Sequence, residues 1–534
     1  MPAEASKPAR HVEVEHKFDV VESTVSPSFE GIAAIARVEK LPTQELDATY
    51  FDTPNQDLAR NKITLRRRTG GTDAGWHLKL PAGPDTRTEI RVPLSASSDE
   101  HAVPAELLDV VLAIVRDRPV RPVARISTRR EVQVLHGAQG APLAEFCNDH
   151  VTAWAAGGSG EDDDSGPAEQ HWREWELELL VHNDAATAPA AAELLDRLVN
   201  RLLDAGAVPA GHGSKLARVL GTTLRPDGAQ PHADPIHRAL AEQVRNLVVW
   251  DRAVRADTYD SVHQMRVTTR QIRSLLRDAH DPFPDSTWVL DELRELAAVL
   301  GIARDAEVLA ERYQHQLDEL KPELVRGPVR ERLVEGAQRR YQAGLRRSLA
   351  AMRSRRYFRL LDALDTLVAE IPIPAQGEEP APVTIDAAYR RVRKAAKTAR
   401  AAARQAESLA AGESPETTEQ QGPDNAEHGY RDPDEALHLI RKRAKRLRYT
   451  AAATGGKLVA ARAKAIQTLL GDHQDSVVSR EHLIQQAADA ASAGEDTFTY
   501  GLLFQRESDF ADARRAQVES ALRELDRAVH KTRR

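Results

Sequence analysis

The sequence predicts two domains: an α+β domain built on an antiparallel β-barrel, then an all-α helical-bundle domain with an internal duplication. Two observations carry this prediction. The first 180 or so residues form short runs of alternating polar and apolar residues, broken by Gly, Pro, Asp and Ser, which is typical of antiparallel strands. Beyond residue 235 the alternation disappears, and Ala, Leu, Arg and Glu recur at helical spacing, as in a helical bundle.

The composition of this 534-residue chain limits its class. A hydrophobic content of 41% supports two or three domains with separate cores. The net charge of -7 excludes a generally basic nucleic-acid binder, so a polyanion site must be a local concentration of Arg and Lys. Cys147 is the only cysteine, and residues 1–10 and the later apolar runs lack the pattern of a signal peptide or membrane span, which predicts a cytoplasmic protein.

The predicted first strand carries the feature on which the site prediction depends. In residues 11–17 (HVEVEHK), Glu13, Glu15 and Lys17 occupy alternate positions. Alternate side chains of a strand share a face and lie about 7 Å apart. Two carboxylates placed in this way are costly to bury unless a cation lies between them, and a hard divalent ion is the natural candidate.

Charged residues of both signs also alternate in later runs, beyond a helix expected around Phe29 to Glu39. A single charged strand face is most often exposed to solvent. Because both signs recur along several strands, a closed barrel with a polar interior accounts for them together. The cations would hold phosphates and the carboxylates would hold metals. The alternating residues are Arg66, Arg68, Lys79, Arg87, Arg91, Arg125 and Arg129, and Glu145, Asp149, Glu174, Glu176 and Glu178.

These residues resemble the CYTH superfamily of triphosphate tunnel metalloenzymes, which includes adenylate cyclases, thiamine triphosphatases and inorganic triphosphatases. The resemblance covers residues 8 to 220. One departure is the acidic insert of residues 157–170, expected to be a disordered surface loop. An amphipathic helix over residues 187–205 is expected to pack against the barrel. The matching motifs are Glu13-x-Glu15-x-Lys17, residues 46–58 (LDATYFDTPNQDL), Leu65-Arg66-x-Arg68, Leu78-Lys79, Arg87-x-Glu89, the Asp149 strand, Glu176-x-Glu178 and Ser214-Lys215.

The resemblance implies metal-assisted hydrolysis of a phosphoanhydride, with Glu13, Glu15 and Lys17 as catalytic residues. A divalent ion makes water easier to deprotonate, and fixed cations stabilise charge on the transferred phosphoryl oxygens. The carboxylates expected to hold Mg²⁺ or Mn²⁺ are Glu13, Glu15, Asp149, Glu176 and Glu178. The cations expected to bind substrate are Arg66, Arg68, Lys79, Arg87, Arg125, Arg129 and Lys215.

A stretch rich in Pro, Gly and polar residues, 222–235, is predicted to link a domain of residues 8–221 to a helical domain of residues 236–530. Two repeats are expected there, about 236–405 and 434–530, with a polar, disordered insert at 411–433. In each repeat, one His and three cations flank an apolar seam at the same offsets, and a Leu-Gly pair and an Asp follow. These residues are His263, Arg266, Arg270 and Arg273 in the first repeat, and His438, Arg441, Lys445 and Arg448 in the second.

The helical spacing places each set of four within an arc of roughly 80°. Like charges along one stripe repel each other, and a bound polyanion offsets this cost. The alternative is that the cations pair with acids of the bundle, such as Asp305 and Asp475. The pattern resembles the CHAD domain, a helical module often found after a CYTH domain and associated with polyphosphate, and this resemblance implies that the eight residues bind polyphosphate.

The leading hypothesis is an inorganic triphosphatase that acts on triphosphate or short polyphosphate and associates with polyphosphate granules. Two alternatives stay open: adenylate cyclase or organic triphosphatase activity of the barrel, and a scaffold that binds polyphosphate without turnover. An aromatic content of 4% argues against a nucleic-acid partner, because few stacking platforms are present. No membrane partner is expected, and the oligomeric state is left open.

Overall fold

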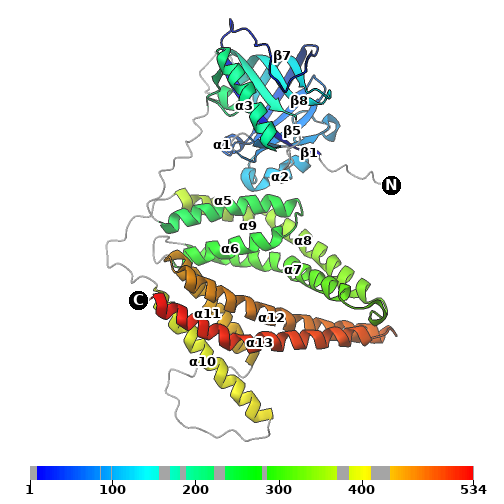
Figure 1. The fold of residues 1–534 in the computed structure, drawn as a ribbon, viewed down its shortest axis with the longest axis vertical. Helices are drawn as coiled ribbons and strands as arrows, with labels where there is room; N and C mark the ends of the chain where they lie inside the picture. The colour runs from blue at the N-terminus through cyan, green and yellow to red at the C-terminus, as the bar shows by residue number, and fades with distance from the viewer. Residues whose placement is uncertain are drawn as a thin grey trace. The chain divides into compact units, whose positions relative to one another are not determined.

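The structure is a computed structural model (Figure 1). It describes residues 9–83, 86–97, 99–155, 169–180, 188–221, 235–278, 286–369, 384–410 and 433–532. The segments expected to be an acidic insert (157–170), a linker (222–235) and a polar insert (411–433) lie outside the described residues, apart from their last one or two positions. Those positions begin a strand or a helix in each case.

Eight strands close into an antiparallel barrel in the N-terminal half of the described chain (Figure 1). Every strand pairing is antiparallel, and the last strand pairs again with the first. The predicted barrel is therefore confirmed. In order around the barrel, the strands are β1 (Ala9–Val20), β6 (Thr86–Val92), β5 (Gly75–Pro81), β4 (Thr64–Thr69), β3 (Gln44–Asp52), β7 (Arg121–His136), β8 (Pro142–Ala155) and β9 (Glu169–Leu179). Short strands β2 (Arg37–Lys40) and β10 (Val208–Pro209) pair with β7 and β1.

Two helices cover the outside of the barrel with apolar side chains. Leu107 of α2 (Ala105–Val115) packs in one core cluster with Trp76 of β5. Leu198 of α3 (Ala188–Asp204) packs in a second cluster with Trp175 of β9. Because these strand residues alternate with charged ones, burying the apolar face against the helices leaves the charged face inside the barrel. The helix expected over residues 187–205 is confirmed as α3.

A third helix, α4 (Lys215–Val219), fills part of the barrel interior. Its Leu216 belongs to a buried cluster with Ile126 of β7 and Ala48 of β3. The hydroxyl of Ser214 caps this helix by accepting a hydrogen bond from the backbone N–H of residue 217, at 3.1 Å. The cap fixes the start of α4 and directs the side chain of Lys215 among the acids of the lumen.

The helix expected around Phe29 to Glu39 is wrong. Residues up to 36 form turns, and β2 then pairs with β7. Phe29 and Ile32 are buried against Trp175 and its neighbours, and a spacing of three apolar residues suits a buried turn as well as a helix. Gly31 lies between them with φ +85°, a left-handed conformation that interrupts a right-handed helix.

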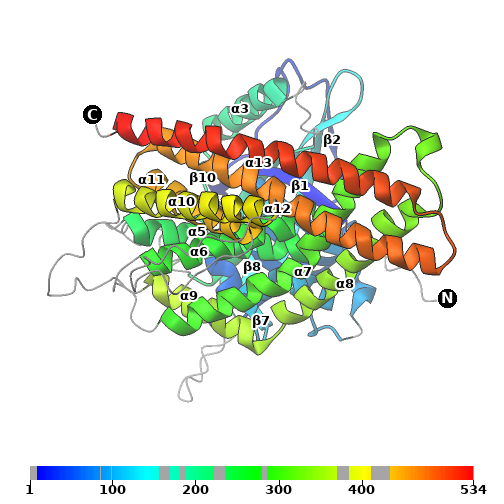
Figure 2. The ribbon, with the colours of Figure 1, turned by 90° about the horizontal axis from the view of Figure 1, so that it is seen from below.

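The remaining described elements are almost all helical, which confirms the predicted all-α region. Among the residues that the structure describes, no helix combines the length and the apolar character needed to span a bilayer. Figure 2 shows the two longest of them, α12 and α13, running side by side. The helices are α5 (Pro235–Arg255), α6 (Ser261–Asp278), α7 (Ser286–Asp318), α8 (Gly336–Met352), α9 (Arg355–Ala369), α10 (Ile385–Ala410), α11 (Pro433–Ala453), α12 (Lys457–Ser492) and α13 (Phe498–Thr532).

The chain divides into two compact units, Met1–Thr268 with Met352–Ile371, and Thr269–Ala351 with Pro372–Arg534. The first unit holds α5 and α9 as well as the barrel. Within it, Arg116 at the end of α2 is buried with φ +59°, and its guanidinium contacts Asp362 and Asp365 of α9. The units do not divide at residues 222–235, and the domain bounds of the sequence analysis stay a prediction.

The second unit has its own apolar core. Helices α10, α11, α12 and α13 contribute to it, through residues such as Val392, Leu447, Ile466 and Leu525. Each of these four helices therefore has one buried face and presents the rest of its surface to solvent or to neighbouring helices.

Candidate functional site

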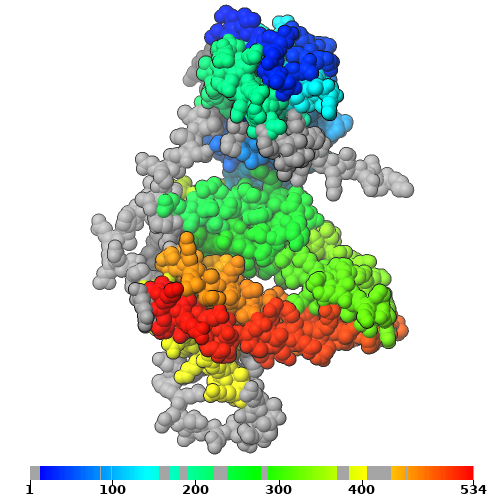
Figure 3. All heavy atoms as spheres, viewed as in Figure 1, coloured from blue at the N-terminus to red at the C-terminus, as the bar shows by residue number. Residues whose placement is uncertain are grey.

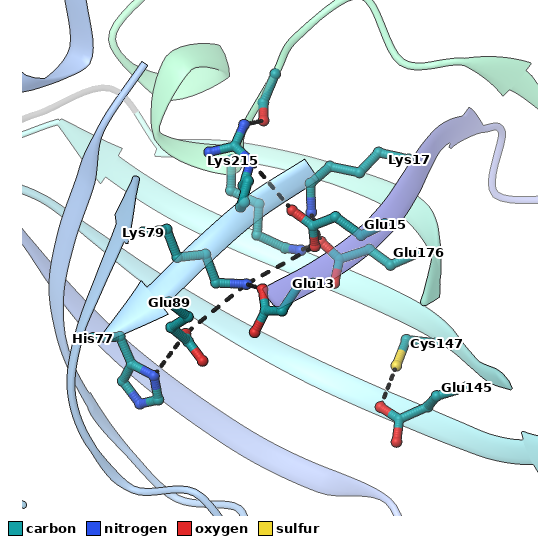
Figure 4. Close-up of polar contacts among 12 residues, drawn as sticks. Glu13, Glu15, Lys17, His77, Lys79, Glu89, Glu145, Cys147, Glu176 and Lys215 are labelled. Atoms are coloured by element: carbon teal, nitrogen blue, oxygen red, sulfur yellow. Dashed lines mark hydrogen bonds and ion pairs between the residues drawn. The ribbon is translucent and has the colours of Figure 1, made fainter. Parts of the chain in front are cut away.

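The barrel lumen contains a cavity of about 320 Å³ lined by charged side chains of both signs. The strand register explains this lining: Glu15 lies opposite Glu178 across β1 and β9, and Lys17 lies opposite Glu176. Figure 4 shows the side chains of Glu15, Lys17 and Glu176 pointing toward one another. The lining cations are Lys17, Arg66, Arg68, Lys79, Arg87, Arg91, Arg130 and Lys215, and the lining acids include Glu13, Glu15, Glu89, Glu145, Glu176 and Glu178.

The ammonium group of Lys215 lies within a cage of three carboxylates. Its Nζ is 2.9 Å from Asp149 Oδ2, 2.6 Å from Glu174 Oε1 and 2.7 Å from Glu176 Oε1. Burial alone would favour the neutral forms, but the opposite charges lower the pKa of Asp149 and Glu176 and raise the pKa of Lys215. These three groups are therefore charged at neutral pH.

Arg130 of β7 holds the same carboxylates and is not among the predicted site residues. Its Nε lies 2.8 Å from Asp149 Oδ1, and its Nη2 lies 2.5 Å from Glu176 Oε2. A two-pronged contact of this kind fixes carboxylates in position as well as neutralising them. In the sequence, Arg130 is only one charge in the run of residues 129–131 (RRE), and this run was the only indication of its role.

The carboxylates of β1 have their own set of cations. Lys79 of β5 contacts Glu13, and Arg87 of β6 places its Nε 3.5 Å from Glu15 Oε1. Lys17 lies 3.2 Å from the other oxygen of Glu15. Burial would raise the pKa of Glu15, but Lys17 and Lys79, with a smaller contribution from Arg87, lower it to about 2. Glu15 is therefore a carboxylate across the physiological pH range.

Glu178 has a different environment. It lies directly opposite Glu15 on one side and Glu145 of β8 on the other, and none of the ion pairs between described residues includes it. Burial and the nearby charge of Glu13, with a smaller effect of Glu15, raise the pKa of Glu178 to about 7. Three carboxylates side by side on neighbouring strands repel each other, so this part of the lumen favours an added cation.

The lumen contains two groups of carboxylates with the oxygen donors that Mg²⁺ and Mn²⁺ prefer. Asp149, Glu174 and Glu176 offer oxygens within 4.8 Å of one another, but the ammonium of Lys215 already lies among them. Glu178, next to Glu15, is the better fit for a divalent ion, because Glu178 has no ion pair among the described residues.

Two guanidinium groups on β4 supply donors for an anion. Arg66 donates to Tyr50 Oη at 3.2 Å, and Arg68 contacts Asp73. The Nε atoms of Arg66 and Arg68 are both buried without a hydrogen-bond partner in the described part of the chain. Burial, followed by the charges of Arg66 and Arg130, lowers the pKa of Arg68 to about 9. These two Nε donors are thus left over for phosphate oxygens.

A buried histidine supports this side of the lumen from behind. The Nε2 of His77 donates to the carbonyl oxygen of Asp73 at 2.9 Å, and its Nδ1 lies 2.9 Å from Glu89 Oε1. Burial lowers the pKa of His77 to about 4. Its partner Glu89 lines the cavity and in turn contacts Arg91.

The placement expected for Arg125 and Arg129 is wrong, because both point away from the lumen. They are 63% and 57% exposed, and Arg125 pairs with Asp47 at 2.5 Å. Strand β7 instead presents Ile126 and Arg130 to the lumen. Ile126 packs on α4 inside the barrel. The sequence pattern predicts that the charged face of each strand points inward, and for β7 this is the wrong face.

In the second unit, two of the predicted cations of α6, Arg270 and Arg273, lie close to those of α11. Burial is the main cause that lowers the pKa of Lys445 to about 8, and the charge of Arg270 is the next. Arg441, Arg448 and Arg273 act in the same direction. Cations from both predicted repeats are therefore close enough to repel each other, as expected for a site that receives an anion.

A glycine of α12 allows one of these cations to approach closely. A Cβ on Gly471 would lie 3.3 Å from Nη2 of Arg441. His438 is half-buried, and burial lowers its pKa. His263 and Arg266 precede Thr269 and so belong to the first unit. That they bind the same anion as the cluster of the second unit stays a prediction.

Comparison with known proteins matches both halves of the chain. A family model described as CYTH domain matches residues 11–204, and one described as CHAD domain matches residues 238–484. Two curated proteins of Mycobacterium tuberculosis are each 69% identical to this chain over 540 residues, with 100% of both sequences covered. They are named Uncharacterized protein MT2285 (strain CDC 1551 / Oshkosh) and Uncharacterized protein Rv2226 (strain ATCC 25618 / H37Rv).

Solved structures of distant sequence are similar to parts of the chain. PptA from Streptomyces chartreusis is 19% identical, with a TM-score of 0.39, over 54% of this chain and 98% of its own. The CHAD domain from Ricinus communis is 22% identical, with a TM-score of 0.38, over 54% and 90%. HpAC1 from Hippeastrum, described as having a dominant triphosphatase activity, is 19% identical, with a TM-score of 0.24, over 40% and 98%. From the two family models and the close relatives, the chain belongs to the family of proteins in which a CYTH domain is followed by a CHAD domain.

Proposed function

We propose that the barrel hydrolyses a phosphoanhydride bond of inorganic triphosphate or short polyphosphate with Mg²⁺ or Mn²⁺, and that the helical domain binds polyphosphate. CYTH and CHAD domains support a function like that of the triphosphate tunnel metalloenzymes. The observation that carries the finer proposal is that the same cavity of about 320 Å³ is lined by Arg66 and Arg68, whose Nε donors have no partner among the described residues, and by Glu178, which has no ion pair among them.

The phosphate chain is proposed to bind along Arg66 and Arg68, whose buried Nε donors have no partner among the described residues. Lys79 on the adjacent strand β5 and Arg87 on the next strand, β6, line the same cavity. These cations stabilise charge on the phosphoryl oxygens, and removing one such contact typically costs on the order of 3 kcal/mol in the transition state.

Glu13, Glu15 and Glu178 are proposed to hold the divalent ion, since Glu178 lies in register with Glu15 and has no ion pair among the described residues. When bound, the ion would neutralise phosphate charge and make an attacking water more acidic. Lys17 positions Glu15 and Glu176 through its two ion pairs.

Asp149 and Glu176 are proposed to hold Lys215 while the lumen is empty. They would become metal ligands if the ammonium group of Lys215 moved toward a bound phosphate, and an exchange of this kind keeps the buried carboxylates paired throughout. Arg125 and Arg129 are not proposed to bind substrate, because they face away from the cavity.

The eight His, Arg and Lys residues predicted in α6 and α11 are proposed to bind polyphosphate. The support for this is that Lys445 is surrounded by Arg270, Arg441, Arg448 and Arg273, whose charges add to the effect of burial in lowering its pKa. Such a domain would place the enzyme on polyphosphate granules of the cytoplasm.

A substrate panel tests the proposal on the purified protein. Phosphate release is measured from triphosphate, longer polyphosphate, thiamine triphosphate and ATP, each with Mg²⁺ and with Mn²⁺. We expect triphosphate to be the best substrate, Glu13→Gln with Glu15→Gln to abolish release, and Arg125→Gln, outside the lumen, to leave it unchanged. Cyclic AMP formed from ATP, or tight binding without phosphate release, would replace the proposal by one of its alternatives.

A further inference from the structure

Helix α10 carries a row of cations that the proposed function does not use. At about 100° per residue, the row lies within an arc of roughly 120°, and at 1.5 Å per residue it is about 21 Å long. All of its members are exposed, and residues 387–405 contain no Asp or Glu. The row consists of Arg390, Arg393, Lys394, Lys397, Arg400 and Arg404.

The opposite face of α10 fixes the orientation of this row. Val392, Ala395 and Ala399 are buried in the core shared with α11, α12 and α13. The cations are therefore held on the solvent side of a packed helix, and part of α10 (yellow) is visible at the surface in Figure 3. A helix whose apolar face is already buried cannot insert that face into a membrane.

Among the described residues, acidic side chains neutralise almost none of the positive charge of this row. Arg400 pairs with Glu519 of α13 at 2.7 Å. The other five side chains form no ion pair and no hydrogen bond with another described residue. Cations three and four positions apart on a helix repel each other, and a bound anion would relieve this repulsion.

Acidic side chains beside the row restrict the shape of such an anion. On the neighbouring helix α13, Glu519 pairs with Arg400 and Asp526 accepts a hydrogen bond from the hydroxyl of Tyr389. Both carboxylates are about half exposed. They would repel a broad anionic surface, such as a membrane or a nucleic-acid duplex, whereas a narrow chain can follow the single row of cations.

The exposed face of α10 also lacks the features that recognise bases. Tyr389 is the only aromatic residue in the helix, and it is buried. Single-stranded nucleic acids bind largely by stacking their bases on exposed aromatic side chains. A chain of phosphates without bases is therefore the polyanion that this surface fits best.

We infer that the exposed face of α10 is a second binding surface for linear polyphosphate, in addition to the cluster of α6 and α11. The inference rests on the ligand class of the proposed function but places it on different residues. Two surfaces on one unit would hold a long chain more tightly than a short one, because the second contact is intramolecular once the first has formed.

Affinity for long-chain polyphosphate, measured by fluorescence anisotropy on the full-length protein, tests this surface. The variant Arg393→Glu, Lys397→Glu, Arg404→Glu is compared with Lys321→Glu, Arg346→Glu, Arg347→Glu, which makes the same charge change at exposed cations of the same unit. We expect at least a tenfold loss for the α10 variant, with less than twofold for the control. The slope of log affinity against log salt should fall by about 2, since each lost contact contributes about 0.7 for a single chain.

A variant that keeps the charge, Arg393→Lys with Arg404→Lys, should retain most of the affinity and so separates charge from misfolding. Equal binding by the α10 variant and the control would overturn the inference, as would a duplex DNA bound through α10 as tightly as polyphosphate. A third variant, Arg441→Gln with Arg448→Gln, tests the proposed cluster separately. If the cluster variant loses affinity for polyphosphate while the α10 variant binds like the wild type, only the α10 surface is disproved. If the α10 variant loses affinity while the cluster variant binds like the wild type, only the proposed cluster is disproved.

Discussion

Glu178 of β9 lies directly opposite Glu15 of β1, with both side chains facing the same cavity. The environment of Glu178 raises its pKa from 4.5 to about 7. Between these two values the folded protein binds more protons than the unfolded chain does, so stability falls as pH rises from 4.5 to 7, and the cost is complete above 7. An ionised Glu178 is thus a source of instability that a divalent ion would remove.

Glu178→Gln should stabilise the metal-free protein at pH 8, by on the order of 2 kcal/mol, and should have little effect at pH 4.5. Added Mn²⁺ should raise the melting temperature of the wild type more than that of the variant. Thermal unfolding with and without metal at the two pH values measures both effects. An equal gain at both pH values, or an equal response to Mn²⁺, would contradict the role given to Glu178.

Lys215→Met should be strongly destabilising, because it leaves Asp149, Glu174 and Glu176 buried without the cation that lies among them. Removing one partner from a buried ionic cluster typically costs about 3–5 kcal/mol. The matched control is Arg129→Met, which removes an exposed cation 3.7 Å from its partner Glu131 and should cost less than about 1 kcal/mol.

Urea unfolding at pH 7 measures the two variants. Mn²⁺ should recover part of the stability of Lys215→Met, because an ion can then occupy the carboxylate cage. Equal stability of the two variants would show that the cage does not depend on Lys215.

The barrel and most of its lumen could be predicted because strand alternation is strict where one face is apolar and the other charged. On β1 and β4 the rule places Glu13, Glu15, Arg66 and Arg68 correctly on the face that lines the cavity. The rule fails on β7 because the lumen is itself apolar where α4 fills it, so Ile126 points inward.

The partners of the charges could not be predicted. The carboxylate cage brings together β8, β9 and the first residue of α4, and a sequence pattern does not encode which of several lumen cations reaches it. Arg130 could not be recognised as a lumen residue because Arg129 and Glu131 flank it, so charged and uncharged residues do not alternate there. The cations of α10 were visible in the sequence, but the pairing of Arg400 alone with an acid of α13 depends on helix packing.

Gly471→Ala should weaken polyphosphate binding by several-fold without lowering stability. The added Cβ would lie 3.3 Å from Nη2 of Arg441 and displace the guanidinium from its place in the cluster. Alanine is preferred over glycine within a helix by about 1 kcal/mol, so the melting temperature should hold or rise. The matched control is Gly501→Ala in α13, where nothing lies within 4 Å of the new Cβ. Equal affinity in the two variants would contradict a binding role for Arg441.

Lys445 gives polyphosphate binding a distinctive pH dependence. Its pKa is lowered from 10.5 to about 8 by burial and by the surrounding arginines. The cost of charging Lys445 in the folded protein is therefore fully present below pH 8 and disappears as pH rises toward 10.5, so the ligand-free protein gains stability over that range. A polyanion favours the charged form, and binding above pH 8 must be accompanied by uptake of a proton.

Affinity for polyphosphate should therefore fall as pH rises from 7.5 to 9.5, by up to about tenfold per pH unit above 8. Lys445→Arg should flatten this fall, because arginine stays charged across the range. Lys442→Arg changes an exposed lysine of the same helix and should keep the wild-type profile. Anisotropy titrations at constant ionic strength measure the three profiles. If Lys445→Arg and the wild type lose affinity in parallel, the proton is taken up elsewhere and the cluster is not the binding site.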